Sequence, residues 1–212
     1  MDALHASRGP GTPLGGSPLS AVVIGASTGG PQTVERIVRA LPADFPVPVA
    51  VCQHMPPGWT RMWAARLDPL CALRIKEAEN RERFRRGTVY IAPYGTHLRF
   101  RRDGREVFVR LDADFADSLF VPSIDYMMSS AAEAFRSGAL GVLLTGLGSD
   151  GALGMLAVRN AGGYTIIERP DSAVASSMPG SAAEIGAAVE AAEADEIASI
   201  IVERVNGVLE SR

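Results

Sequence analysis

The stretch VVIGASTGGP, residues 22–31, decides the fold of this chain. An apolar, β-branched run stops at a glycine, and two hydroxyl residues, two more glycines and a proline follow. Val34, Ile37, Val38 and Leu41 then recur with the spacing of one helix face. The pattern predicts a strand, a tight turn and a helix. Because the N–H groups at a helix N-terminus are free and attract negative charge, this turn suits either a phosphate or a serine nucleophile that forms an oxyanion.

Strands and helices continue to alternate along the chain. The runs VPVAVCQ (47–53) and GVLLT (141–145) are almost wholly apolar, as buried parallel strands are. Residues 97–100 and 106–110 alternate around Asp103-Gly104, which predicts a hairpin. Further strands are predicted at 20–25, 73–76, 88–92 and 163–168. Helices are predicted at 33–40 and 60–67. Another helix begins at Pro122, one that follows the turn 146–151 ends at Arg159, and a last one includes the apolar positions 197–208. The expected fold is α/β: a doubly wound, mostly parallel sheet with helices on both faces and an antiparallel hairpin excursion.

Composition limits the classes of function. The chain has 212 residues, 47% of them hydrophobic, which suits one well-buried domain over residues 19–212. Residues 1–18 are rich in Gly, Pro and Ser and predict a flexible tail or linker. The net charge of −3 argues against a nucleic-acid partner, and the basic run 81–86 is interpreted as a solvated face that could still meet an acidic partner.

The cysteines and apolar runs add expectations about compartment and cofactors. Cys52 and Cys71 form no CxxC pair, so we expect no metal site, and Cys52 is predicted to be a buried small hydrophobe. This cysteine usage suits a reducing compartment. No apolar run is long enough for a membrane helix, and the N-terminus has no signal pattern. The expectation is a cytoplasmic protein without direct membrane insertion.

Three predicted strands end in reactive side chains: Ser27, His54 and Asp150. Ligands of open α/β sheets bind outside the carboxyl ends of the strands, and serine, histidine and aspartate are the parts of a hydrolytic triad. Taken singly, Ser27 and Asp150 could be helix caps or turn residues, and His54, like His97 on the hairpin, could have no role. Residues 25–29 also match G-x-S-x-G, although the order serine, histidine, aspartate differs from that of α/β-hydrolases.

The motifs GASTGGP, QHMPPGWT, KEAEN, YIAP, PSID and TGLGSDGALGM occur in this order. At these residues the chain resembles the catalytic domain of the chemotaxis protein-glutamate methylesterases, the CheB family, from about residue 20 to the C-terminus. The resemblance implies that Ser27 is the nucleophile, His54 the base and Asp150 the acid. It also implies that Thr28 supports the site and that the backbone N–H of Leu147, where methionine is usual, contributes to an oxyanion hole.

The resemblance implies a serine hydrolase that removes methyl esters from glutamate side chains on the cytoplasmic helices of methyl-accepting chemotaxis receptors. Deamidation of receptor glutamines by the same chemistry is a further implied activity, and no cofactor is expected. An alternative is a stand-alone esterase or amidase of the same family with a different substrate. A phosphate-binding module built on the glycine-rich turn and a catalytically silent regulatory domain are two other hypotheses.

The chain also departs from the pattern of the family. A receiver domain usually precedes the linker, whereas this chain has only residues 1–18 there. Val121 and Gly180 stand where arginine is usual, and Ser149 stands where asparagine is common. The two missing arginines bear on how an acidic receptor helix would be recognised, more than on the chemistry.

Overall fold

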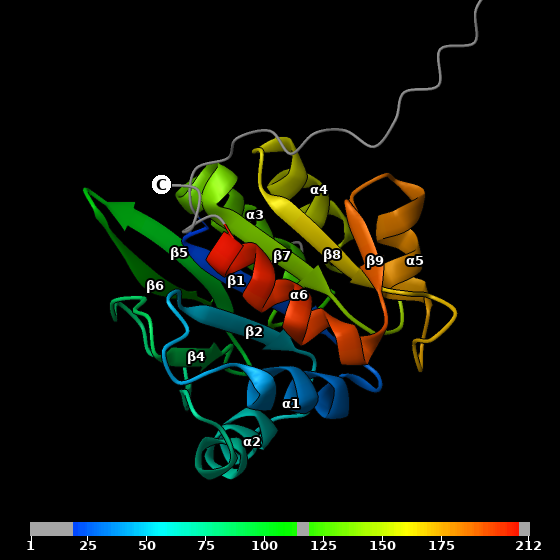
Figure 1. Cartoon of the computed structure of the whole chain (residues 1–212). Helices are drawn as coiled ribbons and strands as arrows, with labels where there is room; N and C mark the ends of the chain where they lie inside the picture. Colours follow the sequence, from blue (N-terminus) through cyan, green and yellow to red (C-terminus); the bar gives the residue numbers. More distant parts are fainter. Residues whose placement is uncertain (1–18, 114–118, 208–212) are drawn as a thin grey trace, which may run out of the picture.

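The computed structural model describes residues 19–113 and 119–207, and the predicted tail 1–18 lies outside them. Seven parallel strands form one sheet in the order β3-β4-β2-β1-β7-β8-β9, and β5 and β6 form a separate antiparallel pair (Figure 1). The strands are β1 (Ala21–Ala26), β2 (Val49–Gln53), β3 (Arg74–Glu77), β4 (Thr88–Ile91), β5 (His97–Asp103), β6 (Glu106–Asp112), β7 (Ala139–Leu143), β8 (Tyr164–Glu168) and β9 (Glu190–Ala192). The predicted fold class is confirmed.

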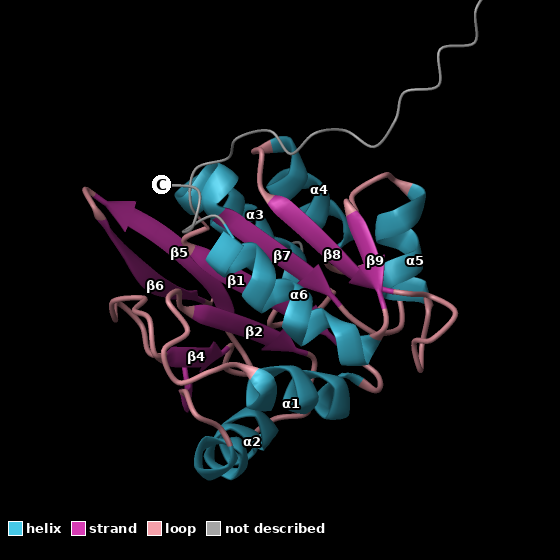
Figure 2. Cartoon of the chain, in the orientation of Figure 1, coloured by secondary structure: helices cyan, strands magenta, loops and turns pink. Residues whose placement is uncertain are grey.

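Six α-helices are assigned within the described residues, and they cover both faces of the sheet (Figure 2). They are α1 (Gly30–Ala40), α2 (Trp59–Leu67), α3 (Ile124–Phe135), α4 (Ala152–Asn160), α5 (Ser177–Glu184) and α6 (Ala194–Gly207). Helices α1, α2 and α6 pack on one face, and α3, α4 and α5 on the other. Strand β1 serves both cores, because Val22 and Ile24 belong to the first and Val23 to the second. None of these helices is long and apolar enough to cross a membrane.

Strand β1 is the topological switch point of the sheet. It pairs with β2 on one side and with β7 on the other, and Gly25 lies opposite Cys52 and Leu143 in the two registers. From β1 the chain winds first towards β2, β4 and β3 and later returns beside β1 as β7. The segments that follow β1, β2 and β7 therefore leave the same edge of the sheet as neighbours, which is where open α/β sheets bind ligands.

The hairpin lies on the α3 face of the sheet. The predicted hairpin is confirmed: its turn residues are Gly104 and Arg105, directly after Asp103, and Gly104 has a φ of 58°. Phe100 on β5 packs edge-on against Phe135 of α3, with ring centroids 5.5 Å apart. In the basic run 81–86 the four arginines are exposed and Phe84 is buried among these rings, which confirms the predicted solvated face.

Several elements differ from the sequence prediction. Helix α1 begins at Gly30 rather than near Thr33, and β7 begins at Ala139, two residues earlier than expected. Helix α5 and strand β9 were missed. Cys52 is fully buried, as predicted, and burial raises the pKa of its thiol well above the usual range.

Candidate active site

Ser27 is the first residue after β1, in a turn that other elements hold. Its N–H donates to the Thr145 carbonyl oxygen (2.9 Å), and its own carbonyl oxygen accepts from Gln53 Nε2 (2.8 Å). Helix α1 is capped by Gly29, whose φ of 82° is left-handed, and no side chain caps that helix. The interpretation of Ser27 as a helix cap is therefore wrong, and its hydroxyl is left for another partner.

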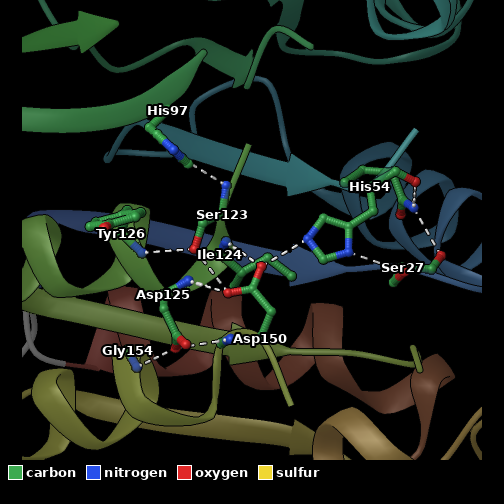
Figure 3. Close-up of polar contacts among 11 residues, drawn as sticks. Ser27, His54, His97, Ser123, Ile124, Asp125, Tyr126, Asp150 and Gly154 are labelled. Carbon is green, nitrogen blue, oxygen red and sulfur yellow. Dashed lines mark hydrogen bonds and ion pairs between the residues drawn. The ribbon is translucent and has the colours of Figure 1, made fainter. Parts of the chain in front are cut away.

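That partner is His54, the first residue after β2 (Figure 3). Its Nδ1 lies 3.2 Å from Ser27 Oγ, and its Nε2 lies 2.8 Å from Asp150 Oδ2. A carboxylate only accepts hydrogen bonds, so Nε2 carries the proton and Nδ1 is the bare nitrogen that faces the serine. This tautomer is the one that can take a proton from the Ser27 hydroxyl.

Asp150 is the third member of this chain of contacts, and it does not cap the helix that follows it. The N-cap residue of helix α4 is Gly151, with a φ of 100°, which has no side chain to cap the helix. The Asp150 carboxylate lies at the N-terminus of α3 instead. Its Oδ1 accepts from Ser123 Oγ (2.9 Å) and the Asp125 N–H (3.0 Å), and its Oδ2 accepts from the Ile124 N–H (2.8 Å) as well as from His54.

These contacts determine the charge of Asp150. Burial raises its pKa, but the hydrogen bonds from His54 and from the N–H groups of Asp125 and Ile124 outweigh that effect, so the pKa lies below its usual value. The free N–H groups and the dipole at the N-terminus of α3 favour the same negative charge. Asp150 is thus held ionised beside the imidazole, where it stabilises a proton on Nε2.

Asp125, in the first turn of α3, makes the reciprocal contact with the start of α4. Its Oδ1 accepts from the N–H groups of Gly151 (2.9 Å) and Gly154 (2.7 Å), while its own N–H donates to Asp150. The aspartate before α4 therefore binds the start of α3, and the aspartate in α3 binds the start of α4. Burial and the nearby charge of Asp150 raise the pKa of Asp125, and hydrogen bonds from backbone N–H groups at the start of α4 offset this only in part.

Asp150 binding the start of α3 and Asp125 binding the start of α4 are here termed the exchange of caps, and replacing Asp125 tests its second half. Asp125→Ala removes the acceptor for two helix N–H groups and should lower the free energy of unfolding by about 1–2 kcal/mol. Asp125→Asn keeps a carbonyl oxygen in the same place and should retain most of the stability. Urea unfolding of both variants at neutral pH measures the difference. Equal losses in the two variants would contradict the capping role.

Besides Asp125 and Thr145, sequence reasoning gave no role to Ser123, His97 and Phe120, which also contact the site. Ser123 caps α3 and donates to Asp150, and its backbone N–H donates to Nδ1 of the buried His97 (3.1 Å). The ring of Phe120 stacks on the His54 imidazole, with centroids 4.4 Å apart and planes 8° from parallel. The serine before an apolar helix start was a usable signal for the cap, whereas nothing in the sequence pattern linked His97 or Phe120 to the strand ends.

The loop after β7 supports Ser27 from the other side. Thr145 Oγ1 donates to the Thr28 carbonyl oxygen (2.8 Å), and the Thr145 N–H donates to Oε2 of the buried Glu168 (2.8 Å). Burial raises the pKa of Glu168, and the contact with Thr145 lowers it in part. A side chain on Gly146 would start 2.8 Å from Ser27 Cβ, so glycine is required there for the two loops to meet.

The two remaining predicted residues lie beside Ser27. Thr28 is exposed and borders the same cavity as Ser27. Leu147 follows Gly146 directly, and its side chain is exposed. Within residues 19–113 and 119–207, the Leu147 N–H donates to no protein acceptor. The same residues contain no group of three His, Cys, Asp or Glu side chains that could hold a metal ion.

A serine, a histidine and an aspartate joined by hydrogen bonds at the switch point of a doubly wound sheet form the arrangement on which serine hydrolases are built. The family model described as CheB methylesterase matches residues 22–201 of this chain. The chain belongs to the CheB methylesterase family.

Similar proteins include the protein-glutamate methylesterase/protein-glutamine glutaminase 3 of Geobacter sulfurreducens, 44% identical over 88% of this chain and 50% of that protein. A protein of Caldanaerobacter subterraneus with the same name, but without a number, is 45% identical over 87% of this chain and 51% of its own. The chain spans about half the length of these relatives. The crystal structure of the Thermotoga maritima CheB methylesterase catalytic domain matches with a TM-score of 0.85 and 40% identity, over 88% of this chain and 99% of that one.

Proposed function

We propose that this chain is a protein-glutamate methylesterase domain, over residues 19–212, that hydrolyses γ-methyl esters of glutamate on the cytoplasmic helices of chemotaxis receptors. The observation that carries the proposal is the continuous contact from Ser27 through His54 to Asp150. The names of the relatives and the family model support the choice of ester and polypeptide. A cytoplasmic location is part of the same proposal, since it follows from the proposed substrate.

The reaction takes two steps with a covalent intermediate. Ser27 Oγ bonds to the ester carbonyl carbon while its proton passes to His54 Nδ1. The carbon–oxygen bond to the methoxy group breaks, the proton moves from His54 to the leaving oxygen, and methanol departs. Water then attacks the acyl-serine as His54 takes its proton. The bond to Ser27 breaks, the serine regains a proton, and free glutamate is released.

The negative oxygen of each tetrahedral intermediate needs donors that are already in place. The Leu147 N–H fits this role because it has no acceptor within the described residues and directly follows Gly146, where an added Cβ would lie 2.8 Å from Ser27 Cβ. The N-terminus of α1 adds positive potential, since the helix begins three residues after the nucleophile. Thr28 supports the site through its backbone contact with Thr145.

Glutamine deamidation is a second candidate activity. The relatives are named for a glutaminase as well as a methylesterase. Attack on a side-chain amide would use the same residues, with ammonia as the leaving group that receives the proton from His54. The same chemistry on a different substrate is the alternative to a receptor enzyme.

Methanol release tests the proposal. Membranes that carry receptors with radiolabelled methyl esters should release volatile methanol in proportion to the added protein. Hydrolysis of p-nitrophenyl acetate without release from receptors would favour an esterase with another substrate. No hydrolysis of either compound would refute a hydrolase.

A further inference from the structure

A cavity of about 600 Å³ opens beside Ser27 and His54, between the turn after β1 and helix α2. Most of its wall is apolar: Pro31, Met55, Pro56, Trp59, Met62 and Trp63. A cavity of this volume is in the range that holds small ligands or several side chains, so one methyl ester leaves most of it empty. The rest of the space must be filled by another part of whatever carries the ester.

The charge of the cavity wall limits what that part can be. Among the described residues that border the cavity, Arg66 is the one with a charged side chain, and its guanidinium is paired with Glu35. The amide nitrogen of Gln53 already donates to the carbonyl oxygens of Ser27 and His54. The wall therefore offers little to an acidic group and a large apolar surface.

Helix α2 exposes apolar side chains on this side although its opposite side is already packed. Trp63, Ala64 and Leu67 bury the face that meets the sheet. Trp59 and Met62 are nevertheless 57% and 66% exposed, and both border the cavity. Large exposed apolar side chains next to a cavity are typical of interaction sites. Their position beside the nucleophile means that the substrate itself is the molecule that would cover them.

We infer that the cavity, here termed the α2 subsite, binds an apolar side chain that neighbours the esterified glutamate on the substrate helix. The inference rests on the proposed function. Residues three or four positions apart on a helix are neighbours on one face. When the ester of one residue reaches Ser27, the side chain one turn away lies over Trp59 and Met62. These two residues then select substrates by the neighbour of the ester, and not by an acidic group.

Two helical peptides of equal length test the α2 subsite. Each carries one γ-methyl glutamate, with leucine four residues before and after it in the first peptide and glutamine in the second. Burying one leucine side chain at the subsite should raise kcat/KM for methanol release about tenfold for the leucine peptide. Equal values for the two peptides would overturn the subsite and leave the esterase proposal standing.

Two matched variants of the enzyme test whether the preference for the leucine peptide arises at the α2 subsite. Met62→Gln should reduce the preference for the leucine peptide at least threefold, because it replaces part of the apolar wall at similar size. Leu70→Gln is the control, since Leu70 is 44% exposed just after α2 and does not border the cavity. An identical preference in both variants would place the recognition elsewhere. Absence of methanol from both peptides would refute the proposed function itself, and the subsite with it.

Discussion

Ser27→Ala should lower the rate of methyl ester hydrolysis by about 10⁴-fold or more, because the attacking oxygen is lost. The fold should survive, since the hydroxyl of Ser27 contacts His54 while its backbone makes the structural contacts with Thr145 and Gln53. Methanol release from methylated receptor membranes measures the rate, and thermal unfolding checks the fold.

Ser199→Ala is the matched control for this prediction. Ser199 is exposed on α6 and does not border the cavity beside Ser27, and its hydroxyl donates to the Glu196 carbonyl oxygen of the same helix. The Ser199→Ala variant should hydrolyse the ester at the rate of the unmodified chain. If Ser27→Ala kept its full rate, Ser27 would not be the nucleophile, whatever its contact with His54.

Asp150→Asn should reduce turnover by about 10³–10⁴-fold, through the tautomer of His54. The carboxylate accepts four hydrogen bonds, two on each oxygen. Asparagine has one acceptor oxygen, so its amide nitrogen must face donors on one side. If the nitrogen faces His54, Nε2 becomes the acceptor, the ring proton moves to Nδ1, and the imidazole can no longer take the proton of Ser27.

The same substitution should change how stability depends on pH. The pKa of Asp150 is lower in the folded chain than its usual value, so its charge stabilises the fold at pH values above that usual value. This contribution is lost as the pH falls through the folded pKa. Asp150→Asn should unfold more easily at neutral pH and lose less stability on acidification than the unmodified chain. The same pH dependence of the free energy of unfolding in Asp150→Asn and in the unmodified chain would contradict this prediction.

The sequence predicted the sheet and the three strand ends because the signals there are local. An apolar run that stops at glycine marks β1, and two further runs mark β2 and β7, so that the residues following each could be named. Helix α5 and strand β9 were missed for a local reason as well. Pro179 and Gly180 interrupt the apolar spacing of α5, and β9 is three residues long without a β-branched side chain.

The contacts that hold the site depend on tertiary structure and left no such signal. Whether Ser27 and Asp150 cap helices is decided by the neighbouring glycines, which take the cap positions with positive φ. Ser123 reaches Asp150 only because α3 and α4 start side by side. The stacking of Phe120 on His54 joins two loops that are far apart in sequence, which periodicity cannot detect.

The exchange of caps between α3 and α4 has a consequence for the energy of the reaction. A group that stabilises a transient charge is most effective when it need not rotate or shed water as the charge forms. Four donors from α3 and His54 already fix the carboxylate of Asp150 in the resting state. When His54 becomes positively charged, the Asp150 carboxylate is therefore already in its final position. The energy of orienting this carboxylate is spent during folding and does not add to the barrier of the reaction.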